Sequence, residues 1–589
     1  MLRTHTCGEL DAKDVNKKVS LCGWVHSRRD HGGVIFIDLR DRYGLTQAVF
    51  DPSHSKNVHK DGEKLRREFV IKVDGVVKAR KKGMENKKLA TGEIEVFVDK
   101  LEVLNESDVP PIEIDDRIVA NDDMRLEYRY LDLRRPLMQD HIRLRHDIAQ
   151  ETREYMNSKK FLEIETPLLI RSTPEGARDY IVPSRVNPGK FYSLPQSPQL
   201  YKQILMVSGC DRYYQLAKCL RDEDLRIDRQ PEFTQIDIEM SFLEEEDIYE
   251  LVEGLMKHVF KKVLNVDLKT PFKRLTYDDA MSRYGSDKPD LRFGLELYDV
   301  TKVAKDSDFS VFKNVIAHGG IVKCMNAKGC GNFSRKDLDE LTAHAAVYGA
   351  KGLAWAKVED DVLSSSIIKY ISEKIQKEII KVTGAKNNDL VLFVADKPKV
   401  TNDALGQLRL FIARKLNLAK PGEYNFCWVT DFPLFEWSED EEKYVPMHHI
   451  FSMPKFEDMK YLEKDPSKVK GQLYDLTLNG VEIAGGSIRI HKRDIQESVL
   501  KVIGMDYAQA ERNFGFLIKS FRFGAPPHGG IAVGFDRLVA LIGGQNDIRE
   551  FIAFPKNKSA QCPMDGSPSE VEDSLLRDVH VKLDVVKKK

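Results

Sequence analysis

Alternating apolar positions near the C-terminal end of the chain predict a buried strand that leads directly into a helix. Ile531, Val533 and Phe535 recur at every second position, and the apolar run 538–542 that follows is interpreted as a helix ended by two glycines. Arg537 then lies at the start of that helix, where its guanidinium and the free backbone N–H groups both attract an anion. The alternative is a structural arginine at an ordinary strand–helix junction.

A second alternating pattern occupies residues 213–240, where two strands flank a loop rich in arginine. In the later strand every second residue is a core candidate, and the residues between them are the hydrogen-bond acceptors Gln235, Asp237 and Glu239. A solvent-exposed strand face explains such a row as well. The arginines of the loop favour another interpretation, in which they hold a polyphosphate above an acidic floor.

A third segment, residues 161–169, is a strand preceded by an amphipathic helix. Leu144, Ile148 and Tyr155 form the apolar stripe of that helix. Pro167 places the strand at the edge of a sheet, because proline lacks the N–H donor that an inner strand needs. We expect this edge to face a second subunit.

Residues up to about 105 alternate short β-rich runs with polar turns, and a polar stretch at 54–67 has the character of a helix. The runs cover residues 19–25, 34–39, 45–50, 68–78 and 94–104. Five strands with a helix after the third are what an OB barrel requires, and OB barrels commonly bind single-stranded nucleic acid. A small β-domain of another topology is the alternative.

Composition limits the class of protein. A chain of 589 residues exceeds one hydrophobic core and predicts three or four domains. Its 92 basic and 93 acidic residues nearly cancel, so a nucleic-acid-binding protein of this composition must segregate its charge locally. The basic stretch 78–88 is one such cluster, or else a solvated loop. The cysteines form no CxxC pairs, and Cys324 and Cys330 lack a second ligand pair, which disfavours zinc.

The N-terminal residues lack the apolar centre of an export signal. No apolar run approaches the ~20 residues that span a bilayer. We therefore expect a cytoplasmic protein without a membrane partner, in a compartment that keeps its scattered cysteines reduced.

The Asn-Gly pair at 479–480 is a strong signal for a two-residue hairpin turn. Pairing of the residues on either side of the turn puts Thr477 opposite Glu482 and leaves Asp475 on the same face. Two converging carboxylates suit Mg²⁺, which takes one or two carboxylates together with phosphate oxygens. A solvated hairpin face is the alternative.

Two cations occur in settings that favour a pocket. Arg489 alternates with apolar neighbours on a strand that follows two glycines. Ser197 as N-cap and Pro198 as first helical residue begin a helix. Gln199 and Lys202 then share one face of it, which is either part of the same site or an exposed helix surface. A guanidinium in a pocket binds a carboxylate through two parallel hydrogen bonds.

The segments 161–169, 213–240 and 531–542, in this order along the chain, resemble motifs 1, 2 and 3 of the class II aminoacyl-tRNA synthetases. The strings TPEGARDY at 173–180, QSPQLYK at 196–202 and RDED at 221–224 are similar to those of the bacterial aspartyl branch. The similarity runs from the first residue to about 558. It implies an α/β multidomain fold, with an N-terminal OB-fold β-barrel, a class II catalytic domain built on an antiparallel sheet, and an inserted α+β GAD domain.

The resemblance also implies the domain boundaries and a homodimer formed through motif 1 around Pro167. The domains are an OB-fold anticodon-binding domain at 1–105, a linker at 106–127, the two parts of the catalytic domain at 128–289 and 425–558, the GAD insertion at 290–424 and a tail at 559–589.

The implied reaction is the ATP-dependent attachment of L-aspartate to tRNA(Asp), by way of aspartyl-adenylate. Arg221 would bridge the substrate carboxylate and the α-phosphate, and Arg537 would hold the γ-phosphate, so both are expected to be catalytic. Residues expected to bind aspartate are Glu175, Gln199, Lys202, Arg221, Asp237, His448 and Arg489. Residues expected to bind ATP are Arg221, Asp222, Glu223, Gln230, Phe233, Glu482, Gly534, Phe535, Asp536 and Arg537. Mg²⁺ is expected at Asp475 and Glu482, and a loop salt bridge is the alternative for Glu223.

Anticodon contacts are implied at five positions of the N-terminal domain, Arg29, His31, Phe36, Gln47 and Glu95. Phe36 would stack on an unpaired base, although a buried core phenylalanine is the alternative. A histidine at position 31, beside two glycines, is typical of family members that charge both tRNA(Asp) and tRNA(Asn), and it implies relaxed anticodon choice.

Two positions depart from the family pattern. Ala484 replaces the first of three glycines, and Ile450 replaces a proline, and either change could reshape the pocket. An asparaginyl enzyme is the closest rival, and it should lack both the insertion and the Arg489 and Lys202 cations. A catalytically silent synthetase-like tRNA-binding protein is the other rival, and such relatives usually lose motif arginines. The sequence leaves open whether tRNA(Asn) is charged, what the insertion does and whether the tail is ordered.

Overall fold

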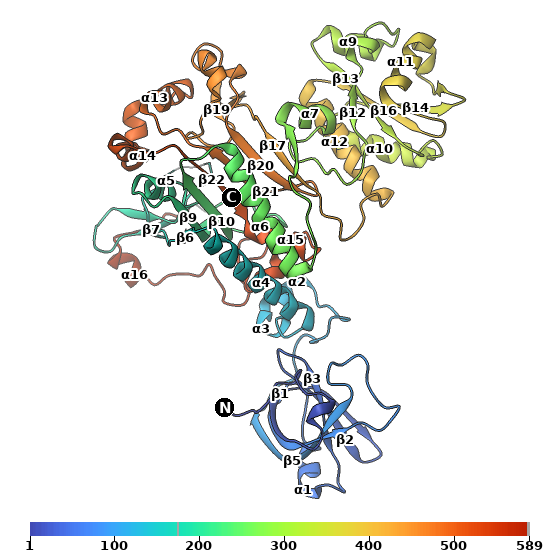
Figure 1. Ribbon diagram of the computed structural model, residues 1–589, viewed down its shortest axis with the longest axis vertical. Coiled ribbons are helices and arrows are strands. Elements are labelled where there is room, and N and C mark those ends of the chain that lie inside the picture. The colour runs from blue at the N-terminus through green and yellow to red at the C-terminus, as the bar shows by residue number, and fades with distance from the viewer. Residues whose placement is uncertain (174–175, 586–589) are drawn as a thin grey trace. The chain divides into compact units, whose positions relative to one another are not determined.

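The computed structural model describes residues 1–173 and 176–585, with the elements labelled in Figure 1. Its contacts divide the chain into two compact units, one made of residues 1–143 and 549–570 and the other of residues 144–548 and 571–589. Glu175, which the sequence places at the aspartate site, lies outside the described residues. None of the described helices combines the length and the apolar character that a bilayer span requires.

A closed five-stranded barrel in the first unit confirms the predicted OB fold. The strands join in the order β1-β2-β3-β5-β4, and one helix separates β3 from β4. The elements are β1 (Lys18–His31), β2 (Val34–Arg40), β3 (Leu45–Phe50), α1 (Lys56–Gly62), β4 (Val70–Ala79) and β5 (Ile94–Asn105). The interior is filled by every second strand residue, so that Leu21, Val25, Ile35 and Ile37 are completely buried. The first strand continues past its predicted end at 25 to His31.

A buried ion-pair network holds the helices that follow the barrel. These helices are α2 (Asp122–Glu127), α3 (Arg129–Asp132) and the start of α4 (Pro136–Ser158). Glu68 accepts hydrogen bonds from Arg40 at 2.8 Å and from Arg134 at 2.8 Å, and Asp132 accepts from Arg135 at 2.7 Å. Because these carboxylates are almost inaccessible to solvent, removing one of the arginines would leave a buried charge only partly compensated.

An eight-stranded sheet forms the body of the second unit, in the order β11-β17-β20-β21-β22-β10-β9-β6. Its inner strands are antiparallel, and the outermost pairs, β11 with β17 and β6 with β9, are parallel. The strands are β6 (Leu162–Glu163), β9 (Arg212–Leu220), β10 (Glu232–Ser241), β11 (Lys273–Thr276), β17 (Phe426–Thr430), β20 (Leu473–Leu478), β21 (Val481–Ile488) and β22 (His528–Gly534).

The predicted motif 1 strand shrinks to the two residues of β6, at the edge of the sheet. Pro167 lies beyond its end. Helices α4 and α6 (Glu245–Leu264) lie side by side, as Figure 1 shows, and the hydroxyl of Tyr155 on α4 donates to the carbonyl of Leu251 on α6 at 3.1 Å. Trp428 of β17 donates to Glu253 of α6 at 3.0 Å, which fixes α6 against the sheet.

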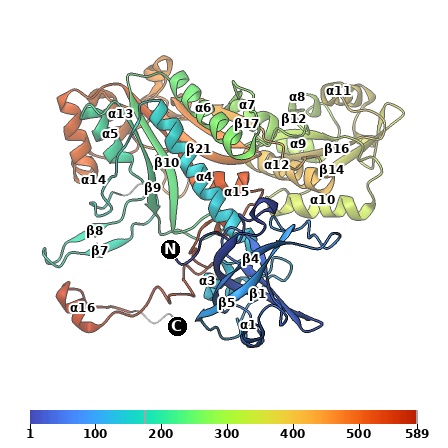
Figure 2. The ribbon, with the colours of Figure 1, turned by 60° about the horizontal axis from the view of Figure 1, so that its bottom comes forward.

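The predicted insertion forms its own three-layer domain around a five-stranded sheet, in the order β12-β13-β16-β14-β15. Figure 2 shows α10 and α11 on opposite sides of this sheet. Leu390 and Leu392 of β16 pack with one helical layer, and Val391 and Phe393 with the other. The strands are β12 (Leu297–Asp299), β13 (Ile321–Ala327), β14 (Ala354–Glu359), β15 (Val362–Ser364) and β16 (Leu390–Asp396), and the helices are α8 (Thr301–Ala304), α9 (Ser310–Ala317), α10 (Arg335–Val347), α11 (Glu373–Thr383) and α12 (Pro398–Lys415).

Two buried cations fasten this domain to the chain that enters it. Lys323 of β13 donates to the carbonyl of Ser282 at 2.9 Å, at the C-terminal end of α7 (Tyr277–Tyr284). Arg409 of α12 donates to the carbonyl of Asp290 and lies against the rings of Tyr284 and Phe293 at 4.9 and 4.6 Å. Cationic side chains suit the carbonyl-rich end of a helix and the faces of aromatic rings.

Within its described residues, the second unit contains five further α-helices and two small hairpins. They are α5 (Gln199–Val207), α13 (Arg493–Val502), α14 (Tyr507–Ser520), α15 (Phe535–Ile542), α16 (Asp573–Asp578), the hairpin of β7 (Ile181–Pro183) and β8 (Phe191–Ser193), and the hairpin of β18 (Phe435–Ser438) and β19 (Lys443–Pro446). Helix α15 follows β22 directly and places Arg537 in its first turn, as the apolar pattern predicts.

Candidate active site

A cavity of about 470 Å³ opens on the face of the main sheet formed by β10, β21 and β22. The loop between β9 and β10 contributes to its wall. Its lining includes eleven residues that the sequence predicts for the site: Gln199, Arg221, Glu223, Gln230, Phe233, Asp237, His448, Glu482, Gly534, Asp536 and Arg537. Residues from three sequence segments that are far apart therefore meet in one cavity.

Four buried charged side chains lie together at the place where Asp237 lines the cavity. The ammonium group of Lys202 is 2.6 Å from Asp237 Oδ1 and 3.3 Å from Glu239 Oε2. Arg489 donates from Nε and Nη2 to the two oxygens of Glu239 at 3.0 and 3.2 Å, and from Nη1 to Ser487 Oγ at 2.7 Å. All four charged side chains are at most 5 % exposed. The acceptor row of β10 is thus a buried ion cluster, and the interpretation of a solvated strand face is wrong.

The absence of a side chain at two glycines leaves room for buried carboxylates. β10 pairs with β22 so that Glu239 lies beside Gly530, where a Cβ atom would be 2.0 Å from Glu239 Oε2. A Cβ at Gly485 would likewise be 2.7 Å from Asp475 Oδ1. Gly530 and Gly485 are therefore positions where the carboxylates of Glu239 and Asp475 need the space that a side chain would fill.

The protein environment shifts the pKa values of the cluster in opposite directions. Burial raises the pKa of Asp237 to about 6, although Lys202 opposes the shift. Burial acts on Glu239 in the same direction, but Arg489 and Lys202 together hold the pKa of Glu239 below its usual range. Burial, with Arg489 and Lys202 nearby, lowers the pKa of His449 to about 3, so this imidazole is neutral at physiological pH.

Two buried polar atoms, on residues that line the cavity, have no hydrogen-bond partner among the described residues. One is the acceptor Oδ2 of Asp237, and the other is the donor Nε2 of Gln199. An unpaired buried polar group costs roughly 1–3 kcal/mol. A ligand that offers a donor to Asp237 and an acceptor to Gln199 would recover this energy.

Helix α5 carries both Gln199 and Lys202 into the site. It begins at Gln199, one residue later than predicted, because Pro198 has a ψ of 13° and serves as the N-cap. Gln199 and Lys202 are 8 % and 1 % exposed, so the prediction of an exposed helix surface is wrong. Gln203, one turn further, contacts Nε2 of the buried His528 at 3.2 Å and so ties the helix to β22.

The other end of the cavity carries cations at two places. Arg221 lies over the ring of Phe233, with its Cζ 5.1 Å from the ring centroid, and donates to the carbonyl of Gln196 at 3.3 Å. Arg537 donates from Nη1 to the carbonyl of Glu482 at 2.9 Å. The distribution fits a nucleotide that extends from an aromatic ring to a guanidinium.

Three residues predicted to bind ATP already have protein partners. Asp536 is buried, and its carboxylate accepts from Arg145 and, at 2.7 Å, from the backbone of Thr234. Phe535 is buried beneath the same arginine, with Arg145 Cζ 4.8 Å from its ring. Asp222 turns toward Arg178, at 3.9 Å. Asp536 and Phe535 hold motif 3 against β10. Asp222 could contact a nucleotide only after a conformational change of the loop between β9 and β10.

The hairpin of β20 and β21 contains a bulge that the sequence does not reveal. Thr477 pairs with Glu482 as predicted, but the next pair joins Leu476 to Ala484, so Ile483 is the extra residue. Asp475 then lies opposite Gly485, on the face that carries Glu482. Burial raises the pKa of Asp475 well above its usual value, and the charge of Glu482 raises it further.

Such mutual repulsion of carboxylates is what a bound divalent cation relieves, so Asp475 and Glu482 fit a Mg²⁺ site. His448 lies beside them, with Nε2 3.6 Å from Asp475 Oδ2. Burial lowers the pKa of His448 to about 4, so it contributes no positive charge near neutral pH. Carboxylate oxygen is the ligand type that Mg²⁺ prefers.

The two departures from the family pattern lie at the margin of the site. Ala484 pairs with Leu476 on one side and Val533 on the other, and both partners are completely buried in the core. Because paired residues share a face, the methyl group of Ala484 points into the core, away from the carboxylates of the hairpin. Ile450 accepts a hydrogen bond from Gln496 at 3.0 Å through its carbonyl, which any residue would supply.

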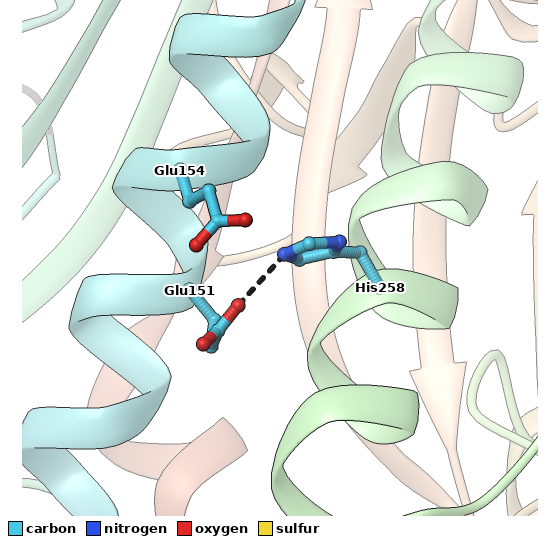
Figure 3. A group of neighbouring side chains, drawn as sticks. All are labelled: Glu151, Glu154 and His258. Carbon is cyan, nitrogen blue, oxygen red and sulfur yellow. Dashed lines mark hydrogen bonds and ion pairs between the residues drawn. The ribbon is translucent and has the colours of Figure 1, made fainter.

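A second group of potential metal ligands occurs on the paired helices, where Glu151 and Glu154 of α4 face His258 of α6 (Figure 3). The ligand atoms lie within 4.8 Å of one another. His258 is 2.9 Å from Glu151, and Lys262 is 3.9 Å from Glu154. Each carboxylate already has a protein partner, so the group serves as a contact between two helices.

The predicted anticodon residues gather on the outer face of adjacent barrel strands. Arg29 of β1 pairs with Phe36 of β2, whose neighbours along the strand fill the core. Phe36 is half-buried on the outside, so the alternative of a core phenylalanine is wrong. Gln47 and Glu95 precede the paired residues of β3 and β5 and so lie next to each other. His31 is exposed at the end of β1, beside the glycine turn.

Comparison with known proteins agrees with this arrangement. Residues 121–558 match the family described as tRNA synthetases class II (D, K and N), and residues 19–104 match the OB-fold nucleic acid binding domain. The chain belongs to the class II synthetase family. The class II match includes every residue assigned above to the cavity, and the resemblance found in the sequence is confirmed.

Relatives with similar sequences cover the synthetase over nearly its whole length. A protein of Desulfatibacillum aliphaticivorans named aspartate–tRNA(Asp/Asn) ligase is 54 % identical over 99 % of the chain and 98 % of its own length. One of the same name from Caldanaerobacter subterraneus is 52 % identical over 99 % of the chain and 98 % of its own length.

Solved structures share the fold at low sequence identity. The asparaginyl-tRNA synthetase of Pyrococcus horikoshii, complexed with asparaginyl-adenylate, is 20 % identical with a TM-score of 0.59, and the match covers 94 % of this chain and 98 % of the other. The aspartyl-tRNA synthetase of Entamoeba histolytica is 19 % identical with a TM-score of 0.56, over 93 % and 90 % of the two chains. These similarities support the fold class alone.

Sequence reasoning missed Glu239 as a site residue, although it identified the acceptor row to which Glu239 belongs. The alternation along β10 places Glu239 on the same face as Asp237, two residues away. Its role depends on Arg489, which is 250 residues away in the chain. The loop residue Asp228, which contacts Arg537, was also missed, and no sequence pattern distinguishes it from the other acids of the loop.

Proposed function

We propose that this synthetase is an aspartate–tRNA ligase, which activates L-aspartate with ATP and transfers it to tRNA(Asp). The observation that carries the proposal is the buried cluster of Lys202, Arg489, Asp237 and Glu239 beside a cavity lined by Asp237 and Gln199, each of which has an unpaired polar atom. The names of the full-length relatives support the same activity.

The cluster has the groups that an acidic amino acid requires. A guanidinium has five N–H donors, and three of those of Arg489 bind Glu239 and Ser487. One N–H on each Nη atom is left, and the two form a fork for the side-chain carboxylate of aspartate. The unpaired oxygen of Asp237 accepts from the α-ammonium group, and Gln199 donates to the substrate.

Activation joins the α-carboxylate of aspartate to the α-phosphate of ATP and releases pyrophosphate. Arg221 neutralises the charge that develops at the α-phosphate, and Arg537 holds the γ-phosphate at the far end of the cavity. Phe233 stacks on adenine, and Glu223 and Gln230 contact the nucleotide. Mg²⁺, held by Asp475 and Glu482, would neutralise phosphate charge when bound. The 3′ hydroxyl of the tRNA then attacks the aspartyl carbonyl, and AMP leaves.

The barrel face formed by Arg29, Phe36, Gln47 and Glu95 binds the anticodon, with an unpaired base stacked on Phe36. His31, at the exposed end of β1, allows the anticodons of both tRNA(Asp) and tRNA(Asn) to bind. The enzyme acts as a homodimer through the edge of the main sheet near Pro167. Leu162, Leu168 and Leu169 at this edge are 56 %, 52 % and 53 % exposed, an unusual density of exposed leucine.

Pyrophosphate exchange with aspartate and with asparagine tests the amino-acid assignment. Exchange that responds to asparagine and not to aspartate would establish an asparaginyl enzyme, the second candidate that shares this fold. Aminoacylation of purified tRNA(Asp) and tRNA(Asn) by the wild type and by His31→Leu tests the anticodon assignment. We expect the wild type to charge both tRNAs and the variant to lose charging of tRNA(Asn).

A further inference from the structure

The loop between β9 and β10 places a carboxylate on the guanidinium that the proposed function reserves for phosphate. Asp228 Oδ2 lies 3.2 Å from Nη2 of Arg537. The other terminal nitrogen of Arg537 donates to the carbonyl of Glu482 at 2.9 Å, which fixes the plane of the guanidinium. Asp228 therefore occupies the side of Arg537 that remains open to an anion.

The loop is held in this position by contacts of its own. Arg226 and Arg229 form a tight turn, with the amide of Arg229 donating to the carbonyl of Arg226 at 3.1 Å, and Asp228 lies within that turn. The amide of Ile548 donates to the carbonyl of Ile227 at 3.3 Å, which attaches the tip of the loop to the region after α15.

Glu223, which the proposed function also assigns to ATP, likewise has an ion-pair partner within the loop. Arg229 Nη1 lies 3.0 Å from Glu223 Oε2. The closed loop thus satisfies both an arginine and a glutamate that the proposed function assigns to ATP. Nucleotide must exchange these internal ion pairs for its own contacts.

We propose that Asp228 is a positioning residue for ATP, an internal anion that holds Arg537 ready and competes with the γ-phosphate for it. This rests on the proposed function, because it identifies the anion that displaces Asp228 as the triphosphate of ATP. The carboxylate keeps the guanidinium oriented while the site is empty. It must leave when the triphosphate enters, and it returns when pyrophosphate departs.

The effect of Asp228 on ATP affinity should be modest, because both side chains of the ion pair are partly exposed to solvent. The side chains of Asp228 and Arg537 are 45 % and 27 % exposed, so solvent screens their attraction. Such pairs shift equilibria by roughly two- to fivefold. Asp228→Asn removes the charge with little change of shape, and we expect it to tighten ATP binding by about that factor.

Calorimetric titration of ATP and of AMP into the full-length protein, without amino acid or tRNA, tests the proposal. AMP has no phosphate that reaches Arg537, so its affinity should be the same in the wild type and in Asp228→Asn. The double variant Asp228→Asn with Arg537→Met should bind ATP no better than Arg537→Met alone. Asp267→Asn, which removes an equal charge from an exposed pair with Lys261, is the matched control and should leave both affinities unchanged.

Steady-state kinetics test the role of Asp228 independently. In Asp228→Asn we expect the KM for ATP to fall and the KM for aspartate to stay the same, a split that general damage to the fold would not produce. Weaker ATP binding, equal ATP binding, or an equal change in AMP binding would each overturn the proposal. If the wild type itself bound no ATP, the proposed function would fail, and that outcome is distinct from a failure of Asp228 alone.

Discussion

Replacing Arg489 by lysine keeps the positive charge beneath the cavity and removes the fork. In the structure three N–H groups of Arg489 bind Glu239 and Ser487, and the two that remain are proposed to bind the substrate carboxylate. A lysine ammonium is a point charge with three donors. It can hold one oxygen of Glu239 and cannot form two parallel bonds to aspartate at the same time.

The expected loss follows from the hydrogen bonds involved. A hydrogen bond to a charged group contributes about 1.5–3 kcal/mol, and one to two of them are lost. Because lysine retains part of the attraction, we expect a net loss of roughly 2–4 kcal/mol in kcat/KM for aspartate, or about 30- to 1,000-fold at 1.36 kcal/mol per factor of ten. The KM for ATP should stay near that of the wild type, because Arg489 is not part of the nucleotide end of the cavity.

ATP–pyrophosphate exchange as a function of aspartate concentration measures this loss, and thermal unfolding checks that the variant is folded. Arg493→Lys is the matched control, because Arg493 forms an exposed pair with Glu497 at 2.7 Å and lies only four residues further along the chain. It should remain within about twofold of the wild type, as exposed pairs contribute little. A folded Arg489→Lys variant that retains aspartate kcat/KM within about threefold would refute the assigned role of the fork.

Three further results are expected. Because burial raises the pKa of Asp237 to about 6, aspartate affinity measured without ATP should fall about tenfold per pH unit as pH drops below 6, since the protonated carboxyl no longer accepts from the ammonium group. Calorimetric titration of aspartate between pH 5 and 8 measures this affinity, and the His449→Gln variant should show the same decline. Asp475→Asn should raise the Mg²⁺ concentration for half-maximal exchange about tenfold or more without lowering the melting temperature, because a repelled buried carboxylate is removed. Arg409→Met should lower the free energy of unfolding in urea by about 3–5 kcal/mol, since its carbonyl partners lose their donor, whereas the exposed Arg414→Met should change it by less than about 0.5 kcal/mol.

The sequence was sufficient for features that depend on local periodicity. The period of two in β10 assigned Asp237 and Glu239 to one face, and the strand–helix junction at Arg537 followed from an apolar pattern. Periodicity fixes the face of a side chain but not its partner. The pairing of Glu239 with Arg489 requires β10 and the end of β21 to be brought together across β22, which depends on the order of strands in the sheet.

Features that depend on a single inserted residue or on a loop conformation were beyond sequence reasoning. The bulge at Ile483 changes the partner of Asp475 without any glycine or proline to mark it. The family resemblance implied that Asp536 contacts ATP, yet its carboxylate accepts hydrogen bonds from Arg145 and from the backbone of Thr234. Neighbouring residues on a helix point in different directions, so Asp536 and Arg537 contact different partners.

The pairing of Glu239 with Arg489 also changes how discrimination between aspartate and asparagine must work. Two buried cations are balanced by two buried carboxylates, so the cluster offers no net positive charge that would by itself prefer an acid. The proposed fork of Arg489 presents a pair of donors in fixed directions, and a guanidinium has no acceptor. The amide of asparagine would turn an N–H donor toward one of them, leaving both unpaired at a buried site. At a buried site, two unpaired donors cost more free energy than the loss of a screened attraction between charges. Under the proposed assignment, the direction of the hydrogen bonds therefore selects aspartate.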